Sequence, residues 1–165
     1  MSETLTTLCY LRHGDKVMLA EKQRKVGAGK YNGYGGKLEA GEMPELAMLR
    51  ETREEICVTP TVYKKLAEIL FCNPDDERIR MHTFVATEWD GKPTATDEMK
   101  KLEWFQIDKI PYDKLMPCDY KWIDYVLGDQ ACKGVIYYDE NWNVDEKRSI
   151  IYTVADFKLP GDRLL

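Results

Sequence analysis

Residues 35–58 read GGKLEAGEMPELAMLRETREEICV, a glycine-rich loop joined to a segment with helical periodicity. The glycines at positions 35, 36 and 41 allow the backbone to turn sharply and to approach a ligand closely. Pro44 suits the first turn of a helix, and we predict a helix over Pro44–Ile56. The helical repeat places Leu46, Leu49 and Ile56 on one side of this helix, which we expect to be its buried side.

The other side of the predicted helix carries a concentration of acid. Glu51, Glu54 and Glu55 are spaced i, i+3 and i+4, and like charges at such spacings destabilise a helix by about 0.2–0.5 kcal/mol per pair. Clustered carboxylates are suitable ligands for Mg²⁺ or Mn²⁺, ions that bridge to substrate phosphates and polarise them. The alternative is a solvated acidic face moderated by Arg50 and Arg53, and composition alone favours this alternative.

The spacing of these residues shifts the balance between the two interpretations. The glycine at position 36 is followed by five residues, then Glu42, then seven residues, and then the run RETREE at positions 50–55. This pattern resembles the Nudix box. Thr52 stands where an aliphatic residue is usual in that family, and Cys57 stands where a glycine usually ends the helix. We expect Cys57 to strain the helix exit if the backbone there needs a positive φ.

The resemblance implies an α/β fold, the Nudix-type α/β/α sandwich with a mixed β-sheet between helices. It also implies hydrolysis of a nucleoside diphosphate linked to another group, with Mg²⁺ as the cofactor and Mn²⁺ as an alternative. In the family pattern Arg50 orients a glutamate, Glu42 supports the loop and helix, and Glu55 is the central carboxylate. The implied metal ligands are the backbone carbonyl of Gly35 and the carboxylates of Glu51, Glu54, Glu55 and Glu98, and the implied catalytic residues are Arg50, Glu54, Glu55 and Glu98.

The likeness extends beyond the box. Residues 16–22, 27–37, 96–99 and 104–106 look like the MutT-type branch of the family, and within it the enzymes that hydrolyse oxidised purine nucleoside triphosphates such as 8-oxo-dGTP. In that branch Glu98 would bind metal or activate water. The alternative is that Glu98 is only an exposed acidic residue with no role in the site. Asn32 would read the purine edge, and an Asn that stabilises a turn is the alternative. The implied substrate-binding residues are Thr7, Lys22, Asn32, Tyr34, Gly36, Lys37, Met116, Cys118 and Asp119.

One segment departs from this branch in the region implied to hold the purine. The branch has Trp-Pro-Asp-Asp, whereas residues 116–119 read MPCD. A tryptophan face stacks on a base for about 1–3 kcal/mol, and Met116 offers a weaker, more flexible surface. Two neighbouring carboxyls can share a proton and so both donate and accept hydrogen bonds to different oxidised bases. A lone Asp119 can match fewer such patterns. We therefore expect a narrower or weaker base preference, with Cys118 as a passive wall residue rather than a reactive thiol.

The remaining chain supplies strands and one further helix. Apolar and β-branched runs predict strands at 5–11, 16–20, 66–72, 81–89 and 102–107, and a helical period predicts a helix at 119–127. Residues 134–138 and 149–157 are expected to form a late hairpin. This mixed order is typical of a sheet covered by helices, and we expect a single Nudix domain over residues 1–165.

Composition limits the partners of the protein. The 29 acidic and 24 basic residues give a formal net charge of −5, which argues against polymeric nucleic acid and anionic membranes as partners. Residues 16–37 hold six basic residues and one acidic residue, and residues 39–55 hold six acidic and two basic residues. Such an acidic cradle beside a basic approach suits a single nucleoside triphosphate. The sequence has no apolar run long enough to span a bilayer and no secretory signal pattern, so we expect a cytoplasmic protein. We also expect a monomer, and we expect the five cysteines to be free thiols.

Two alternative functions remain open. The same chemistry could act on ADP-ribose, a dinucleoside polyphosphate or an unmodified nucleotide. Alternatively, the chain could be a Nudix module that binds nucleotide without turnover. The complete set of Glu51, Glu54 and Glu55 with Arg50 argues against the non-catalytic module, which has no need of it.

Overall fold

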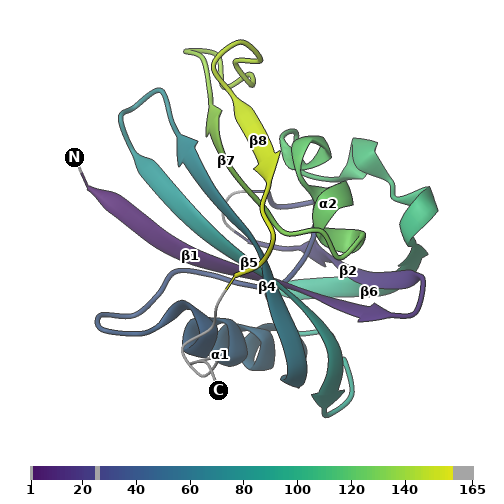
Figure 1. The fold of residues 1–165 in the computed structure, drawn as a ribbon. Coiled ribbons are helices and arrows are strands. Elements are labelled where there is room, and N and C mark those ends of the chain that lie inside the picture. The colour runs from purple at the N-terminus through teal and green to yellow at the C-terminus, as the bar shows by residue number, and fades with distance from the viewer. Residues whose placement is uncertain (1, 25–26, 158–165) are drawn as a thin grey trace.

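The computed structural model describes residues 2–24 and 27–157 of the chain. Its strands are β1 (Glu3–His13), β2 (Lys16–Lys22), β3 (Tyr31–Asn32), β4 (Thr59–Cys72), β5 (Arg78–Asp90), β6 (Met99–Gln106), β7 (Cys132–Tyr137) and β8 (Ile150–Thr153). Within the described ranges they form one sheet in the order β3-β2-β1-β5-β4-β7-β8, with β6 paired to β2 (Figure 1). The pairs β1/β5 and β4/β7 are parallel and the other pairs are antiparallel, so the sheet is mixed.

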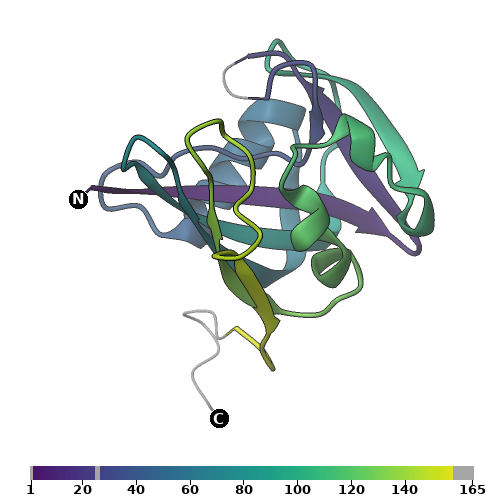
Figure 2. The ribbon, with the colours of Figure 1, turned by 90° about the horizontal axis from the view of Figure 1, so that it is seen from above.

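Helices cover both faces of this sheet. Helix α1 (Pro44–Ile56) lies against one face (Figure 1). The opposite face is covered by the 3-10 turns η1 (Ile107–Lys109), η2 (Tyr112–Lys114) and η3 (Asp119–Lys121), and by the short helix α2 (Ile123–Leu127) (Figure 2). The predicted α/β/α sandwich with a mixed sheet is confirmed.

The alternation of side chains along the strands divides the core into two clusters, one on each face. On the α1 side, Cys9 of β1 belongs to a buried cluster with Met48 and Ile56. On the opposite side, the next residue along the strand, Tyr10, belongs to a second buried cluster with Trp122. The position of a residue along β1 therefore decides which layer its side chain enters.

Helix α1 begins and ends where the sequence predicts. Its first residue is Pro44, and Cys57 caps its C-terminus with a φ of 65°, in the left-handed region that glycine usually occupies. The strain expected at Cys57 is therefore present. The N–H of Cys57 donates to the carbonyl of Arg53 at 3.0 Å, which closes the last turn.

The buried side of α1 differs from the prediction. Met48, Ile56 and the carboxylate-bearing Glu55 are buried, whereas Leu46 is 57% exposed. The reason is a polar contact, because the backbone N–H of Gly35 donates to the carboxylate of Glu55 and draws this side chain toward the sheet. One of the clustered acids thus lies on the side that we expected to be apolar.

Three other elements also differ from the prediction. Strand β4 begins at Thr59 rather than at residue 66, because it pairs with β5 over its whole length. The helix predicted over 119–127 is divided at Trp122, whose φ of −134° separates η3 from α2. In the late hairpin, β8 covers only Ile150–Thr153 of the predicted 149–157. No helix in the described residues is long and apolar enough to cross a membrane.

Candidate active site

Arg50 ties the glycine-rich loop to helix α1. Its Nε and Nη2 atoms donate to the two carboxylate oxygens of Glu42 at 2.8 and 2.9 Å, the bidentate geometry that the planar guanidinium favours. Nη1 donates to Glu51 at 2.9 Å, and Nη2 also donates to the carbonyl of Lys37 at 3.2 Å. The hydrogen bonds from Arg50 lower the pKa of Glu42 to about 2. Arg50 thus contacts both Glu42 and Glu51, and the roles of orienting a glutamate and supporting the loop stay predictions.

We expect Arg50→Gln to lower the melting temperature by a few degrees near pH 7, because it removes the charged partner of Glu42. The folded-state pKa of Glu42 is depressed from 4.5 to about 2, so this stabilisation is present above pH 4.5 and is lost as the pH falls toward 2. Urea unfolding of the variant and the parent protein should therefore give a stability gap that narrows over that range. Arg53→Gln, an exposed change in the same helix, is the control. If the difference in unfolding free energy between Arg50→Gln and the parent protein is the same at pH 7 and pH 2.5, Arg50 is not the group that stabilises the charged form of Glu42.

Glu55 is the buried carboxylate at the centre of the acidic cluster. It is 4% exposed, and its Oε2 accepts the backbone N–H of Gly35 at 3.1 Å. The pKa of Glu55 is raised to about 8, chiefly by burial; the nearby charges of Glu51 and Glu98 act in the same direction, and the hydrogen bond from Gly35 opposes them. Glu98, from the distant loop, therefore lies near enough to Glu55 for its charge to act on this carboxyl, and its role in metal binding or water activation stays a prediction.

The loop that carries Glu98 is fastened to the end of α1. The hydroxyl of Thr96 donates to the backbone carbonyl of Glu55 at 2.7 Å, and the N–H of Glu98 donates to the same hydroxyl at 3.3 Å. The carbonyl of Glu98 accepts the N–H of Gln23 at 2.9 Å. Glu98 is therefore held beside Glu55 by its own backbone contacts, and sequence spacing could not have shown Thr96 as the connecting residue.

The donors of this cluster fit a divalent metal ion in their chemistry. Glu51, Glu55 and Glu98 offer hard oxygen atoms, and burial together with mutual repulsion raises the pKa of Glu51 as well as that of Glu55. A cation would relieve this repulsion. The carboxylates are not yet arranged as ligands, because in the described residues no three acidic, His or Cys side chains converge closely enough to hold an ion. Glu54 is more than half exposed and faces Arg50 at 3.4 Å.

Gly35 and Gly36 are packed so closely that neither position has room for a side chain. A Cβ atom on Gly35 would lie 1.9 Å from the carbonyl oxygen of Thr7, and one on Gly36 would lie 2.6 Å from Oε1 of Glu51. Any side chain at position 36 would therefore displace the carboxylate that Arg50 holds. The sequence-based expectation that these glycines permit close backbone approach agrees with this geometry.

The residues expected around the purine lie on the opposite face of the sheet. Cys118 and Asp119 are both 4% exposed, and one carboxylate oxygen of Asp119, Oδ2, is buried with no hydrogen-bond partner among the described residues. Burial raises the pKa of Asp119 to about 7 and that of the Cys118 thiol to about 12. Such a thiol is protonated and unreactive at neutral pH, in agreement with a wall residue. The half-buried Met116 lies against Gly27, and Lys22 approaches the same glycine.

Two predicted substrate residues are corrected by their positions. Thr7 alternates with Leu8, which faces the cluster of Trp122, so the Thr7 side chain points to the α1 layer and not toward Asp119. Tyr34 is fully buried in the α1 layer, and its hydroxyl donates to the carbonyl of Met18 at 2.7 Å. Tyr34 is therefore a core residue rather than a substrate contact, and Thr7 does not face the predicted base pocket.

Asn32 and Lys37 occupy positions that leave their predicted roles open. Asn32 is half-buried, and its Oδ1 accepts the N–H of Gly33 at 2.9 Å, which is the turn chemistry given as its alternative role. Lys37 is exposed beside Arg50. Sequence reasoning missed Tyr138, which stands next to the Cys118 thiol and has its pKa raised by burial. Its position depends on the pairing of β7 with β4, which the local sequence does not show.

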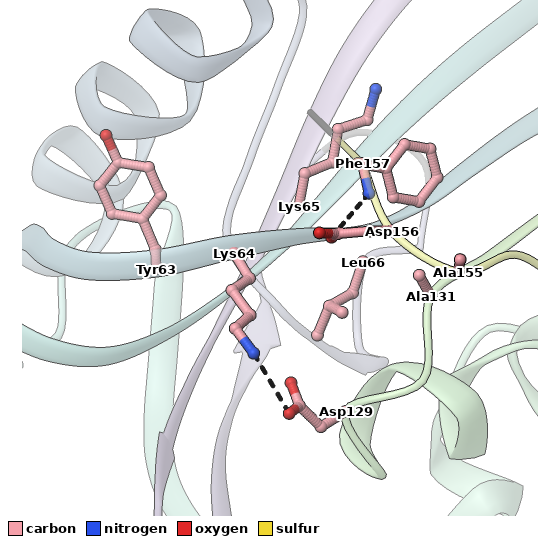
Figure 3. A pocket seen from close by; sticks show the side chains of 9 residues that line it. All are labelled: Tyr63, Lys64, Lys65, Leu66, Asp129, Ala131, Ala155, Asp156 and Phe157. Carbon is pink, nitrogen blue, oxygen red and sulfur yellow. Dashed lines mark hydrogen bonds and ion pairs between the residues drawn. The ribbon is translucent and has the colours of Figure 1, made fainter. Parts of the chain in front are cut away.

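A separate cavity of about 420 Å³ lies along β4, away from these groups (Figure 3). It is bounded by Lys64 and Asp129, whose charged groups are 3.4 Å apart, and by Phe157, over whose ring Lys65 lies at 4.7 Å. None of the predicted site residues lines it. The cavity is therefore unrelated to the acidic cluster.

The chain is similar to known proteins over most of its length. The model of the NUDIX domain matches residues 3–126. The oxidized purine nucleoside triphosphate hydrolase of Danio rerio is 38% identical over 134 residues, which are 81% of this chain and 85% of that protein. The protein of the same name from Mus musculus is 36% identical over 74% of this chain and 79% of its own length. A crystal structure of the mutator MutT protein from Bacillus halodurans superposes with a TM-score of 0.74 at 26% identity, covering 91% of this chain and 97% of that one.

Proposed function

The chain belongs to the NUDIX domain family of hydrolases, and from that membership we propose that it hydrolyses oxidised purine nucleoside triphosphates such as 8-oxo-dGTP to the monophosphate and pyrophosphate. The relatives from Danio rerio and Mus musculus are named for hydrolysis of oxidised purine nucleoside triphosphates. The observation that carries the proposal is the pairing of the acidic cluster on α1 with the buried Asp119 on the opposite face of the sheet. The acidic cluster suits chemistry at the phosphates, and Asp119 suits a hydrogen bond to the edge of the base.

We assign the phosphate chemistry to the acidic cluster and its supports. A divalent cation, for which we propose Mg²⁺ with Mn²⁺ as a substitute, would neutralise phosphate charge and make the attacking water more acidic. Glu51, Glu54, Glu55, Glu98 and the carbonyl of Gly35 are the proposed ligands. Arg50 holds Glu51 in place, and Gly36 leaves room for that carboxylate.

Within this arrangement we assign proton acceptance to Glu55. It is the most buried acid of the cluster, and the N–H of Gly35 fixes one of its oxygens. Attack of water on the α-phosphorus breaks the bond to the bridging oxygen and releases pyrophosphate, and the water proton passes to the Glu55 carboxylate. A bound cation would favour this ionised form of Glu55 over the protonated form that burial favours. Glu98 lies close enough for its charge to act on Glu55, and we assign to it the positioning of Glu55 during this transfer.

We assign base recognition to Asp119 and its neighbours. A carboxyl whose pKa is near 7 exists in both protonation states at neutral pH, so it can donate a hydrogen bond as well as accept one. Met116 and Cys118 are assigned to the adjacent wall, Lys22 lies near Met116 at Gly27, and we assign Asn32 to the same pocket. Because the family's neighbouring acid is absent at Cys118, we propose a narrower base preference. Polymeric nucleic acid is not a proposed partner, and we propose a cytoplasmic monomer.

The test is a nucleotide panel with detection of pyrophosphate. We expect pyrophosphate release from 8-oxo-dGTP in the presence of Mg²⁺ and none after chelation. The kcat/KM values for 8-oxo-dGTP and 2-hydroxy-dATP should differ by at least about tenfold, the effect of one hydrogen bond, and dGTP and dATP serve as unmodified controls. Equally efficient use of both oxidised purines would contradict the narrower preference. Turnover of ADP-ribose or a dinucleoside polyphosphate alone would establish the alternative substrate, and binding without turnover would establish a nucleotide-binding module.

A further inference from the structure

We propose that Thr96, in the loop between β5 and β6, is a positioning residue for the acidic cluster. Its hydroxyl group holds Glu98 against the end of helix α1 and thereby sets the affinity of the cluster for a divalent cation. This inference rests on the proposed function, because it deepens the assignment of Glu98 as a metal ligand. Thr96 touches neither the substrate nor the cation in this proposal, and it acts through Glu98.

The C-terminal end of α1 is completed by the loop that carries Thr96. The last carbonyl groups of a helix have no partner within the helix and need donors from elsewhere. The carbonyl of Ile56 accepts the backbone N–H of Thr94 at 2.9 Å. The carbonyl of Glu55 accepts the hydroxyl of Thr96 at 2.7 Å. The loop is therefore fastened to the same turn of the helix that carries the buried carboxylate.

The hydroxyl oxygen of Thr96 also holds the backbone of Glu98. It accepts the N–H of Glu98 at 3.3 Å and the N–H of Met99 at 3.4 Å. The hydroxyl thus uses its one hydrogen and both of its lone pairs. The N–H of Thr96 donates in turn to the carbonyl of Met99, which is 2% exposed and belongs to the core cluster on the α1 side. A single hydroxyl group therefore joins the backbone of Glu98 to the backbone of Glu55.

This fixation opposes the repulsion between the acids of the cluster. Burial chiefly raises the pKa of Glu51 and of Glu55, and the charge of Glu98 acts in the same direction on both carboxyls. Without a cation, this repulsion favours movement of the Glu98 loop away from α1. The carbonyl of Glu98 is held by the N–H of Gln23 at 2.9 Å, and its N–H is held by Thr96. Loss of the Thr96 hydroxyl would release Glu98 on the side that faces the helix.

The experiment measures Mn²⁺ binding to the protein without substrate, from the electron paramagnetic resonance signal of the unbound ion. Thr96→Val keeps the shape of the side chain and should raise the dissociation constant for Mn²⁺ about ten- to a hundredfold, the effect of removing a group that orients a metal ligand. Thr96→Ala should show the same loss, and Thr96→Ser should restore most of the affinity. Thr94→Val is the matched control, because Thr94 lies in the same loop and its hydroxyl donates to the carbonyl of Lys92 at 2.7 Å.

A double substitution separates the positioning of Glu98 from general support of α1. If Thr96 acts through Glu98, Thr96→Val should add little to the loss of Mn²⁺ affinity that Glu98→Gln causes, because the effects of coupled residues are not additive. Urea unfolding checks that each variant is folded under the conditions of the binding assay. Fully additive losses would show that Thr96 supports the helix independently of Glu98, and would overturn the inference.

The inference is also overturned by unchanged Mn²⁺ binding in Thr96→Val or Glu98→Gln, by an equal loss in Thr94→Val, or by a wild-type protein that does not bind Mn²⁺. The proposed function is tested separately by pyrophosphate release. Mn²⁺ binding that depends on Thr96, without release of pyrophosphate from any nucleotide, would refute the proposed hydrolysis and leave the positioning role supported. Normal hydrolysis together with unchanged Mn²⁺ binding in Thr96→Val would do the reverse.

Discussion

Glu55→Gln is expected to reduce kcat by roughly a hundred- to ten-thousandfold, the range over which a positioned general base contributes. The amide keeps the size of the side chain but cannot accept the water proton, and it offers one fewer anionic ligand to the cation. The free energy of unfolding, unlike kcat, is not expected to fall in this variant at high pH. The folded-state pKa of Glu55 is raised from 4.5 to about 8, so its contribution to stability is present below pH 4.5 and is lost as the pH rises through 8. Above pH 8 the variant should therefore be at least as stable as the parent protein.

The measurement pairs steady-state hydrolysis under saturating Mg²⁺ with urea unfolding at pH 9. Glu88→Gln, an exposed acid at the end of β5, is the control and should leave both quantities unchanged. Glu98→Gln should lower kcat by a smaller factor, because Glu98 acts beside Glu55. Full activity in Glu55→Gln would remove this residue from the mechanism, and a large loss of folding stability would show that the activity had been lost through unfolding.

Asp119→Asn is expected to lower kcat/KM for 8-oxo-dGTP by about ten- to a hundredfold, the cost of losing one hydrogen bond to a charged or charge-sharing group. The loss should appear mainly in KM, because Asp119 lies on the opposite face of the sheet from the acidic cluster. An asparagine donates and accepts at fixed atoms, so it cannot change its pattern with pH as the carboxyl can. The pH profile of KM should therefore become flatter near pH 7 in the variant.

The same substitution has a separate signature in folding stability. The folded-state pKa of Asp119 is raised from 3.8 to about 7 by burial, so its favourable contribution is present below pH 3.8 and is lost as the pH rises through 7. Relative to the parent protein, Asp119→Asn should gain up to about 4 kcal/mol of unfolding free energy between pH 4 and pH 8, as an order of magnitude. Urea unfolding at pH 5 and pH 8 measures the difference. A variant whose stability relative to the parent is independent of pH would show that Asp119 does not titrate as a buried acid.

The sequence predicted the local elements around the Nudix box well, because their signals are local. Pro44 and the spacing of the acids located both ends of α1, and the contacts of Arg50 follow from neighbours on the same loop and helix. The errors arose where a partner far along the chain decides the outcome. The direction of the Thr7 side chain depends on its phase along β1, and the position of Tyr138 depends on a parallel pairing with β4. Leu46 was misplaced because a polar contact with the loop, rather than apolarity alone, orients α1.

The division of the core into two clusters has a consequence for directed evolution of this protein. The residues proposed to interact with the phosphates and those proposed to interact with the base lie on opposite faces of the sheet, against different core clusters, so substitutions on one face have few shared neighbours with those on the other. Effects at such separated positions tend to add. A library confined to the wall around Met116 and Cys118 should therefore yield variants with new nucleobase preferences that keep the parental turnover number, and improvements selected in each layer could be combined without rescreening every pair.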